Sequence, residues 1–343
     1  MGLLIDMIDV GEGDAFLLTL GAPFRDIVYL IDGGAVDAGE TVVSFLNDNA
    51  AGRVDGVIAT HLHIDHIGGL KTVAEKCAIS NFYVNLPPDP QRALTKLVRQ
   101  RLLENKKRGI AWGIIQESLV AMNDLLAVLK AKGITPTGIT VGDVLNLGEI
   151  VLTVLSPNGT RLAAAWEELE SEESEIAQMY REVAEALGHA EAPETTAQNN
   201  ASVVLEIAYK GNPYALMTAD AGADVLREVT AGRAYPFLKV PHHGSKTGLD
   251  EQLVRQIHPR TAYIPVGDNP HGHPANEVLD LLRDNGASTY CSRKTRNCRR
   301  ECPAGGFGTL CHPVDRPLRA GWRFVDSSKC KNNPSNAPPR PPG

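Results

Sequence analysis

The chain has 343 residues, of which 43% are hydrophobic and 22% charged, and its formal net charge is −7. This length suits one large α/β domain with insertions, and the composition is ordinary for a globular protein. The acidic balance argues against nucleic-acid binding through bulk charge alone, and no apolar run approaches the about 20 residues that a membrane span needs. The N-terminus lacks the basic segment of a signal peptide, so we expect a cytoplasmic protein that does not enter a membrane.

Six cysteines are distributed unevenly along the chain. Cys77 stands alone, and the other five follow residue 290: Cys291, Cys298, Cys302, Cys311 and Cys330. Five is an odd number and no Cys-x-x-Cys pair occurs, so neither a regular disulfide framework nor a zinc ribbon is predicted. Reduced thiols are expected in a reducing compartment, with a Cys-rich structural metal site as the alternative.

The chain begins with three short strands, expected at residues 3–9, 14–20 and 27–32. Because Gly-rich turns separate them, they predict an antiparallel meander and not a βαβ unit. The turn Gly-Glu-Gly at residues 11–13 precedes a strand where a dinucleotide fingerprint requires a helix. This turn therefore gives no evidence for nucleotide binding.

An apolar, β-branched run at residues 57–60 ends in His61, His63, Asp65 and His66. Side chains two residues apart on a strand point to the same side, so His61 and His63 are expected to converge, and the other two follow after a turn. Neutral imidazole and carboxylate are suitable ligands for zinc and related divalent ions. The chain has only 10 histidines, and three within six positions indicate a metal site.

The pattern His-x-His-x-Asp-His-x-Gly-Gly at residues 61–69 resembles the signature loop of the metallo-β-lactamase-fold hydrolases. This resemblance implies an α/β protein with an αββα sandwich and a site for two metal ions. Residues 9–15 (Asp-Val-Gly-Glu-Gly-Asp-Ala) and 30–34 (Leu-Ile-Asp-Gly-Gly) are similar to the hydrolase domain of competence proteins of the DNA-uptake channel type, here in a stand-alone, soluble form. Asp14 and Asp32 are interpreted as residues that order loops near the site, or as simple turn formers.

In the second half of the chain, Asp220 follows a predicted strand at 214–219. The resemblance implies that a carboxylate in this position bridges two metal ions. The alternative is that Asp220 is the N-cap of a helix at 224–230.

A buried strand at 237–240 leads into Pro-His-His-Gly-Ser, which also resembles the competence-type subgroup. One of the two histidines is expected to complete the second metal, with His242 favoured, while the other contacts phosphate or water. Further on, the Gly-His-Pro motif places His273 at the entry of a helix at 275–284 that Pro274 would begin.

One ligand of the wider superfamily is missing. A third histidine usually precedes the bridging aspartate, but Asn199 and Asn200 stand in that stretch, as they do in the competence-type relatives. Asparagine is a poor ligand for zinc and acceptable to harder ions such as manganese. Either asparagine, or His189 further upstream, could replace the histidine, so one or two Zn²⁺ ions per chain are expected, with Mn²⁺ as the alternative.

The predicted organisation is a hydrolase domain at 1–290, with helical insertions at about 88–133 and 161–198, followed by an extension at 291–343. The first insertion is basic and the second acidic, and both patterns are typical of solvated helix faces. Steering of a polyanion is a second interpretation of the basic one. The extension contains five cysteines and a basic cluster, and it ends in a Pro-rich tail that is expected to be disordered.

These features favour a metal-dependent hydrolase, a phosphodiesterase or nuclease, whose metal-activated hydroxide attacks phosphorus. The expected metal ligands are His61, His63, Asp65, His66, Asp220 and His242. Asp65 would also orient the nucleophile, while His243 and His273 protonate the leaving group or contact phosphate. The expected partner is a phosphodiester such as a nucleic acid, and no protein partner is indicated. The alternatives are hydrolysis of a lactam, lactone or thioester, and a degenerate module that only binds metal or nucleic acid.

Overall fold

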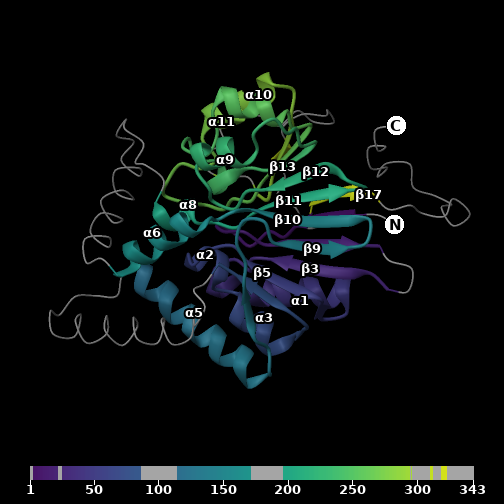
Figure 1. Cartoon of the computed structure of the whole chain (residues 1–343), viewed down its shortest axis with the longest axis vertical. Helices are drawn as coiled ribbons and strands as arrows, with labels where there is room; N and C mark the ends of the chain where they lie inside the picture. The colour runs from purple at the N-terminus through teal and green to yellow at the C-terminus, as the bar shows by residue number, and fades with distance from the viewer. Residues whose placement is uncertain are drawn as a thin grey trace, which may run out of the picture.

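A computed structural model describes residues 3–21, 25–85, 114–170, 196–293, 295, 310–311 and 318–322. Two β-sheets face each other and helices cover their outer faces, so the chain folds as the αββα sandwich that the sequence predicts (Figure 1). The first half of the chain forms most of one sheet and the second half most of the other.

The first sheet has the strand order β17-β1-β2-β3-β5-β7-β8. Its strands are β1 (Leu3–Met7), β2 (Phe16–Leu20), β3 (Ile27–Ile31), β5 (Gly56–Ala59), β7 (Phe82–Val84), β8 (Pro136–Gly138) and β17 (Leu318–Trp322). The first three strands form the predicted antiparallel meander, and β3, β5, β7 and β8 are parallel. A small separate pair joins β4 (Arg53–Val54) to β6 (Ala78–Ile79). The main helices beside this sheet are α1 (Gly39–Ala50), α3 (Leu70–Lys76) and α5 (Ile114–Ala131).

The second sheet has the strand order β16-β15-β14-β13-β12-β11-β10-β9. Its strands are β9 (Val144–Leu147), β10 (Ile150–Ser156), β11 (Val204–Tyr209), β12 (Asn212–Met217), β13 (Phe237–Lys239), β14 (Thr261–Ile264), β15 (Ser288–Cys291) and β16 (Leu310–Cys311). The strands from β12 onwards are parallel. Its outer face is covered by α9 (Ala223–Val229), α10 (Glu251–Ile257) and α11 (Asn276–Asp284) (Figure 1).

Both faces of each sheet are buried, which explains why the strands are continuous apolar runs. In β2, Phe16 and Leu18 face the other sheet and Leu17 packs under the helices. In β12, Met217 faces between the sheets and Leu216 packs against α9 and its neighbours. The alternation of side chains along a strand therefore divides the core into three layers.

The two predicted insertions are only partly described. The first contributes α5, and Gly133 follows that helix with a positive φ of 72°, as a C-terminal glycine does. Its basic segment lies outside the described residues. The second insertion contributes α6 (Gly159–Glu170) and α8 (Ala197–Asn200), while the acidic residues beyond 170 and His189 lie outside the described residues.

Two segments of the predicted extension, residues 310–311 and 318–322, form an outermost strand of each sheet. Residue 290 remains the predicted domain boundary, although it does not separate the sheets. Cys77 and Cys291 are buried free thiols, and Cys298, Cys302 and Cys330 lie outside the described residues. One helix boundary was predicted wrongly: Ala275 is the N-cap of α11, so Pro274 precedes that helix instead of beginning it.

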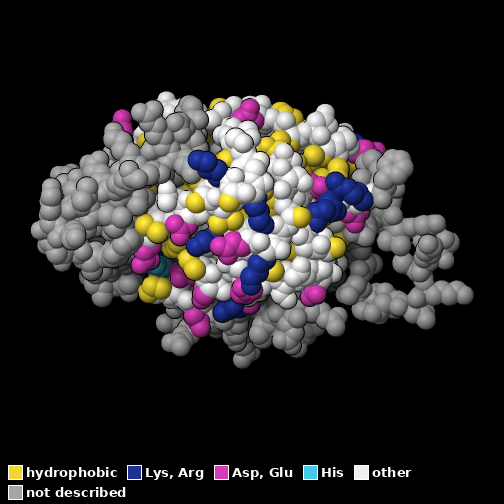
Figure 2. Space-filling view, turned by 90° about the horizontal axis from the view of Figure 1, so that it is seen from below, with side chains coloured by type: hydrophobic (Ala, Val, Ile, Leu, Met, Phe, Trp, Pro, Cys, Tyr) yellow, Lys and Arg dark blue, Asp and Glu magenta, His cyan; other side chains and the backbone are white. Residues whose placement is uncertain are grey.

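The layer of α1, α3 and α5 has a mixed surface, on which Lys and Arg side chains are interspersed with Asp and Glu (Figure 2). Ion pairs join these helices, Lys76 with Glu40 and Lys71 with Asp124. Such exposed pairs contribute little to stability, about 0–1 kcal/mol each. None of the helices in the described ranges combines the length and apolarity that are needed to cross a membrane.

Candidate metal centre

The predicted site residues gather at one edge of the sandwich, because parallel strands of both sheets end there. β5 is followed by His61, β12 by Asp220 and β13 by the turn η2 (Pro241–Gly244), which carries His242 and His243. His63 is the N-cap of the short helix α2 (Ile64–Ile67), whose first turn holds Asp65 and His66. The carboxyl ends of parallel strands are a common position for functional side chains.

Three loops of the first sheet interlock behind this edge. The Asp14 amide donates to the Asp65 carbonyl over 3.2 Å, and the Gly33 amide donates to the His66 carbonyl over 2.8 Å. Gly13 has φ +117°, and a Cβ there would lie 2.0 Å from the Asp65 carbonyl oxygen. Glycine is required at residue 13 because the backbone of the metal loop passes this close.

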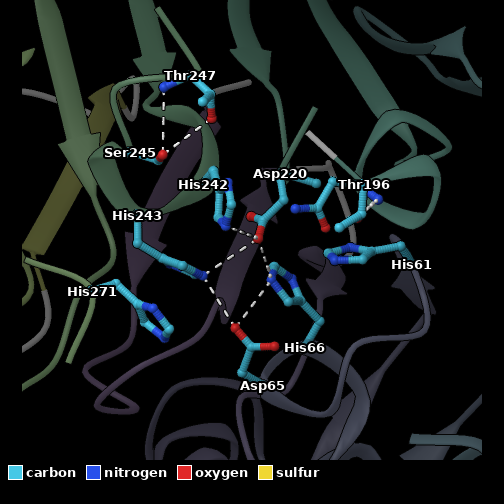
Figure 3. A network of polar contacts seen from close by, with 12 residues as sticks. His61, Asp65, His66, Thr196, Asp220, His242, His243, Ser245, Thr247 and His271 are labelled. Atoms are coloured by element: carbon cyan, nitrogen blue, oxygen red, sulfur yellow. Dashed lines mark hydrogen bonds and ion pairs between the residues drawn. The ribbon is translucent and has the colours of Figure 1, made fainter. Parts of the chain in front are cut away.

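Asp14, His66, Asp220 and His243 each offer a ligand atom, and these atoms all lie within 4.8 Å of one another. Asp220 Oδ2 is 3.3 Å from His66 Nε2 and 3.5 Å from His243 Nε2. Asp65 Oδ2 is 3.1 Å from His243 Nε2 (Figure 3). All these side chains are buried except that of Asp65, which is 26% exposed.

In three histidines, the Nδ1 atom lies within hydrogen-bond distance of a protein oxygen. His243 Nδ1 lies 2.9 Å from the Pro265 carbonyl oxygen and His66 Nδ1 lies 2.8 Å from Asp32 Oδ2. His61 Nδ1 lies 3.1 Å from Thr60 Oγ1, whose hydroxyl donates to the same Asp32 Oδ2 over 2.7 Å. Metal-binding histidines are oriented by such partners, which leave Nε2 as the ligand atom.

The residues fit a divalent metal. The Nε2 atoms of His61 and His66 are buried and have no hydrogen-bond partner among the described residues. Buried polar atoms are nearly always hydrogen-bonded, so such atoms indicate a missing ligand. Imidazole and carboxylate are the donor set of zinc and of other first-row divalent ions.

The charge balance without metal is consistent with this assignment. Burial alone would lower the pKa of His66, but the carboxylates of Asp220 and Asp65 raise it well above its ordinary value. The pKa of His243 rises to about 9, since Asp220 and the hydrogen bond with Asp65 outweigh burial. Burial lowers the pKa of His61, and the neighbouring His66 lowers it further. A metal ion would replace protons on two of these rings.

Lys239 adds a fixed positive charge beneath the cluster. Its side chain is 1% exposed, and Nζ donates to Asp14 Oδ2 over 2.6 Å and to the Ala219 carbonyl over 2.7 Å. Asp220 Oδ1 lies 3.5 Å from the same nitrogen, which leaves Oδ2 for the histidines. Asp14 is therefore paired with a lysine as well as lying within the cluster.

The other predicted residues surround this cluster. The ring centroid of His61 is 4.1 Å from that of His66 and 4.7 Å from that of His63. His242 Nε2 is 4.0 Å from Asp220 Oδ2, farther than the corresponding atom of His243. His273 is 4% exposed, with its ring centroid 5.5 Å from that of His242.

The geometry favours His243 over His242 as the inner ligand, and the backbone explains why. Both residues have positive φ angles, 49° and 52°, which a non-glycine residue rarely adopts. This turn directs His243 toward both Asp65 and Asp220, while His242 approaches the same Asp220 oxygen from a greater distance (Figure 3). The N-cap interpretation of Asp220 is wrong, since Gly222 is the N-cap of α9.

The sequence interpretation missed two residues. Lys239 belongs to the predicted buried strand at 237–240, and a lysine inside an apolar run is itself a signal, because a buried charge requires a partner. Thr60 was read only as the end of a strand. Asp32, expected to order a loop, is fully buried and accepts hydrogen bonds from the Thr60 amide and hydroxyl.

Comparisons with known proteins relate part of this chain to one superfamily. Residues 9–153 match the Metallo-beta-lactamase superfamily. ComE operon protein 3 of Bacillus subtilis (strain 168) is 25% identical over 306 residues, which cover 81% of this chain and 30% of that protein. The chain thus spans less than a third of that relative's length.

Two solved structures are similar to this chain at low sequence identity. A novel metallo hydrolase from the archaeon Ignicoccus hospitalis KIN4/I is 12% identical, with a TM-score of 0.46 over 94% of this chain and 100% of that chain. A metallo-beta-lactamase fold protein from Bacillus subtilis is also 12% identical, with a TM-score of 0.43 over 86% of this chain and 95% of that chain.

Proposed function

Because this chain carries a metallo-β-lactamase superfamily domain with a candidate metal site, we propose that it is a metal-dependent phosphodiesterase or nuclease. The observation that carries the proposal is a set of three histidines whose Nδ1 atoms have fixed partners. Two of them, His66 and His243, direct Nε2 toward the same Asp220 oxygen. The resemblance to competence-type hydrolase domains supports phosphorus as the centre that is attacked. That support is an analogy between families, because one fold can serve several chemistries.

The residues that would hold the metal are His61, His63, Asp65, His66, Asp220 and His243. When bound, a divalent ion supplies Lewis-acid activation of water and stabilises negative charge that develops on oxygen. His66 and His243 are held rigidly by their Nδ1 partners, so the ligand geometry exists before substrate arrives. Asp220 presents Oδ2 toward them while Lys239 lies beside Oδ1.

The partly exposed side chains of the site would contact the substrate. The partly exposed carboxylate of Asp65 is positioned to accept the proton of the attacking water and to orient it. His242 and His271 are 23% and 22% exposed, and they can donate N–H groups to phosphate oxygens or to the leaving group. Figure 3 shows His271 beside His243 on the side of Asp65. We assign to the buried His273 the orientation of His242.

The proposal is tested with chelated protein that is reloaded with Mn²⁺ or Zn²⁺ and assayed on bis-p-nitrophenyl phosphate and single-stranded DNA. We expect hydrolysis that Asp65→Asn reduces at least 100-fold, since the substitution removes the proton acceptor. Asp224→Asn is the matched control, because that carboxylate is 95% exposed and pairs only with Arg227 among the contacts that the structure shows. It should retain full activity.

Absence of hydrolysis of both substrates by folded, metal-loaded protein would refute the phosphodiesterase proposal. A parallel panel with a β-lactam, a lactone and a thioester tests the alternative hydrolase on the same metal centre. Hydrolysis of only these substrates would show that the enzyme attacks a carbonyl carbon and not phosphorus.

A further inference from the structure

The short helix α8 lies between the strand ends that carry the two halves of the candidate metal centre. The Val203 amide, just after α8, donates to the Thr60 carbonyl over 2.9 Å, next to His61. The Gly222 amide, just after Asp220, donates to Asn200 Oδ1 over 3.3 Å. The last turn of α8 is thereby attached to both strand ends.

The first residues of α8 face the same site. Thr196 is the N-cap, and its Oγ1 accepts from the Asn199 amide over 3.0 Å. Figure 3 shows Thr196 beside His61. The Gln198 amide donates to the Glu168 carboxylate over 2.9 Å, and the charge of Glu168 acts on the pKa of His63.

The side chains that flank Asn199 have identified partners. Gln198 donates from Nε2 to the Ala165 carbonyl, and Asn200 accepts from the Gly222 amide. Asn199 lies between them with 2% of its surface exposed, and its Oδ1 is buried with no hydrogen-bond partner among the described residues. His61 Nε2, near the Thr196 end of this helix, is also buried and has no hydrogen-bond partner among the described residues.

Two unsatisfied buried acceptors in this part of the protein are costly. An unpaired buried polar atom destabilises a protein by about 1–3 kcal/mol. A single cation would satisfy both atoms, because a neutral imidazole nitrogen and an amide oxygen are both metal ligands.

We propose that Asn199 Oδ1 is the third ligand, with His61 and His63, of a divalent-ion site that adjoins the cluster of Asp65, His66 and His243. The proposal rests on the function proposed above. An amide oxygen is a harder donor than imidazole, so this site favours Mn²⁺ over Zn²⁺ relative to a site with three histidines. Asn200 has a structural role in the same helix, since it holds the Gly222 amide.

The test counts bound Mn²⁺ in the full chain by electron paramagnetic resonance of the free aqueous ion during titration. We expect two Mn²⁺ per chain in the wild type and one site weakened at least tenfold in Asn199→Leu. Asn199→Asp keeps the ligand oxygen and should retain both sites. Asn200→Ala is the control, and it should retain both sites as well.

Thermal unfolding provides a second readout that distinguishes a ligand from a structural residue. Without metal, Asn199→Leu should be as stable as the wild type or more stable, because an unsatisfied oxygen is replaced by an apolar group of similar size. With Mn²⁺, its gain in unfolding temperature should be smaller than that of the wild type. A residue that only supports the fold would lose stability in both conditions.

If Asn199→Leu does not fold, Asn199→His is measured in its place. The histidine should raise the Zn²⁺ affinity of one site at least tenfold. Wild-type stoichiometry and affinity in Asn199→Leu, or unchanged Zn²⁺ affinity in Asn199→His, would overturn the ligand assignment. One Mn²⁺ per chain in the wild type would overturn it too. Two ions bound without hydrolysis of any phosphodiester would refute the proposed function and leave the ligand assignment standing.

Discussion

Replacing the buried Lys239 by methionine should destabilise the metal-free protein more than any exposed lysine substitution. The change keeps most of the side-chain volume and removes the charge and the three N–H donors. In the native structure that ammonium donates to Asp14 Oδ2 and to the Ala219 carbonyl, at 2.6 and 2.7 Å. Both acceptors are buried, so water cannot take its place.

The expected cost follows from these contacts. Breaking a buried ion pair by removing one partner costs about 3–5 kcal/mol, because the other charge is left unpaired. The Ala219 carbonyl also loses its shortest hydrogen bond, although the His242 amide and the Thr218 hydroxyl still donate to it. Total stabilities of proteins are about 5–15 kcal/mol, so about a fifth of the stability or more would be lost.

The measurement is urea unfolding of chelated protein for Lys239→Met, Asp14→Asn and the double variant. Because the double variant removes both charges, it should be less destabilised than the sum of the two single variants, with a coupling of at least about 1 kcal/mol. Lys246→Met is the control: Lys246 pairs with Glu277 over 2.7 Å, but both side chains are more than half exposed. That substitution should change stability by about 0–1 kcal/mol.

Two results would refute this reasoning. A loss below about 1 kcal/mol in Lys239→Met would mean that the ammonium is not needed to balance Asp14. Additive losses in the double variant would mean that the two residues act independently, which the 2.6 Å contact contradicts.

Three further predictions follow from the site and its surroundings. Gly13→Ala should weaken Mn²⁺ binding at least tenfold in a metal titration, since the new Cβ would collide with the Asp65 carbonyl oxygen. Gly142→Ala is the control, because Gly142 also has a positive φ but no atom lies close to its Cβ position, and it should keep wild-type affinity. Mn²⁺ at about 100 times its Kd should stabilise the wild type by about 2.7 kcal/mol per site in urea unfolding, and His66→Ala should lose most of this increment. Burial would raise the pKa of the Asp55 carboxyl, but hydrogen bonds from two arginines and a backbone amide lower that pKa. The ionised carboxylate therefore stabilises the fold fully above the ordinary pKa of aspartate, and this stabilisation is lost as the pH falls through the lowered value. Urea midpoints of Asp55→Asn should therefore depend less on pH below about 5 than those of the wild type, and an unchanged slope would contradict the pairing.

The sandwich could be predicted because its signals are local. The meander follows from three apolar runs with Gly-rich turns, and the edge that holds the site follows from strands that end in His61, Asp220 and His242. Each of these signals depends on periodicity and on the residue that ends the run.

The details of the centre depend on backbone angles and on pairs far apart in the chain. His242 and His243 are equivalent in sequence, and only their left-handed conformations determine which ring faces Asp65. The partner of Lys239 lies more than 200 residues away, so no spacing rule could identify Asp14. Asn199, Asn200 and His189 are likewise alternatives in sequence, and the contact of Asn200 with the Gly222 amide is one that no sequence pattern predicts.

Asp32 has a further consequence for metal uptake. One of its oxygens, Oδ2, accepts from the ring of His66 and from the hydroxyl that contacts the ring of His61. The tautomers of two histidines, one in each half of the centre, are thus set by a single atom. A disturbance of Asp32 would therefore disorient both rings at once, although they belong to different halves of the candidate centre.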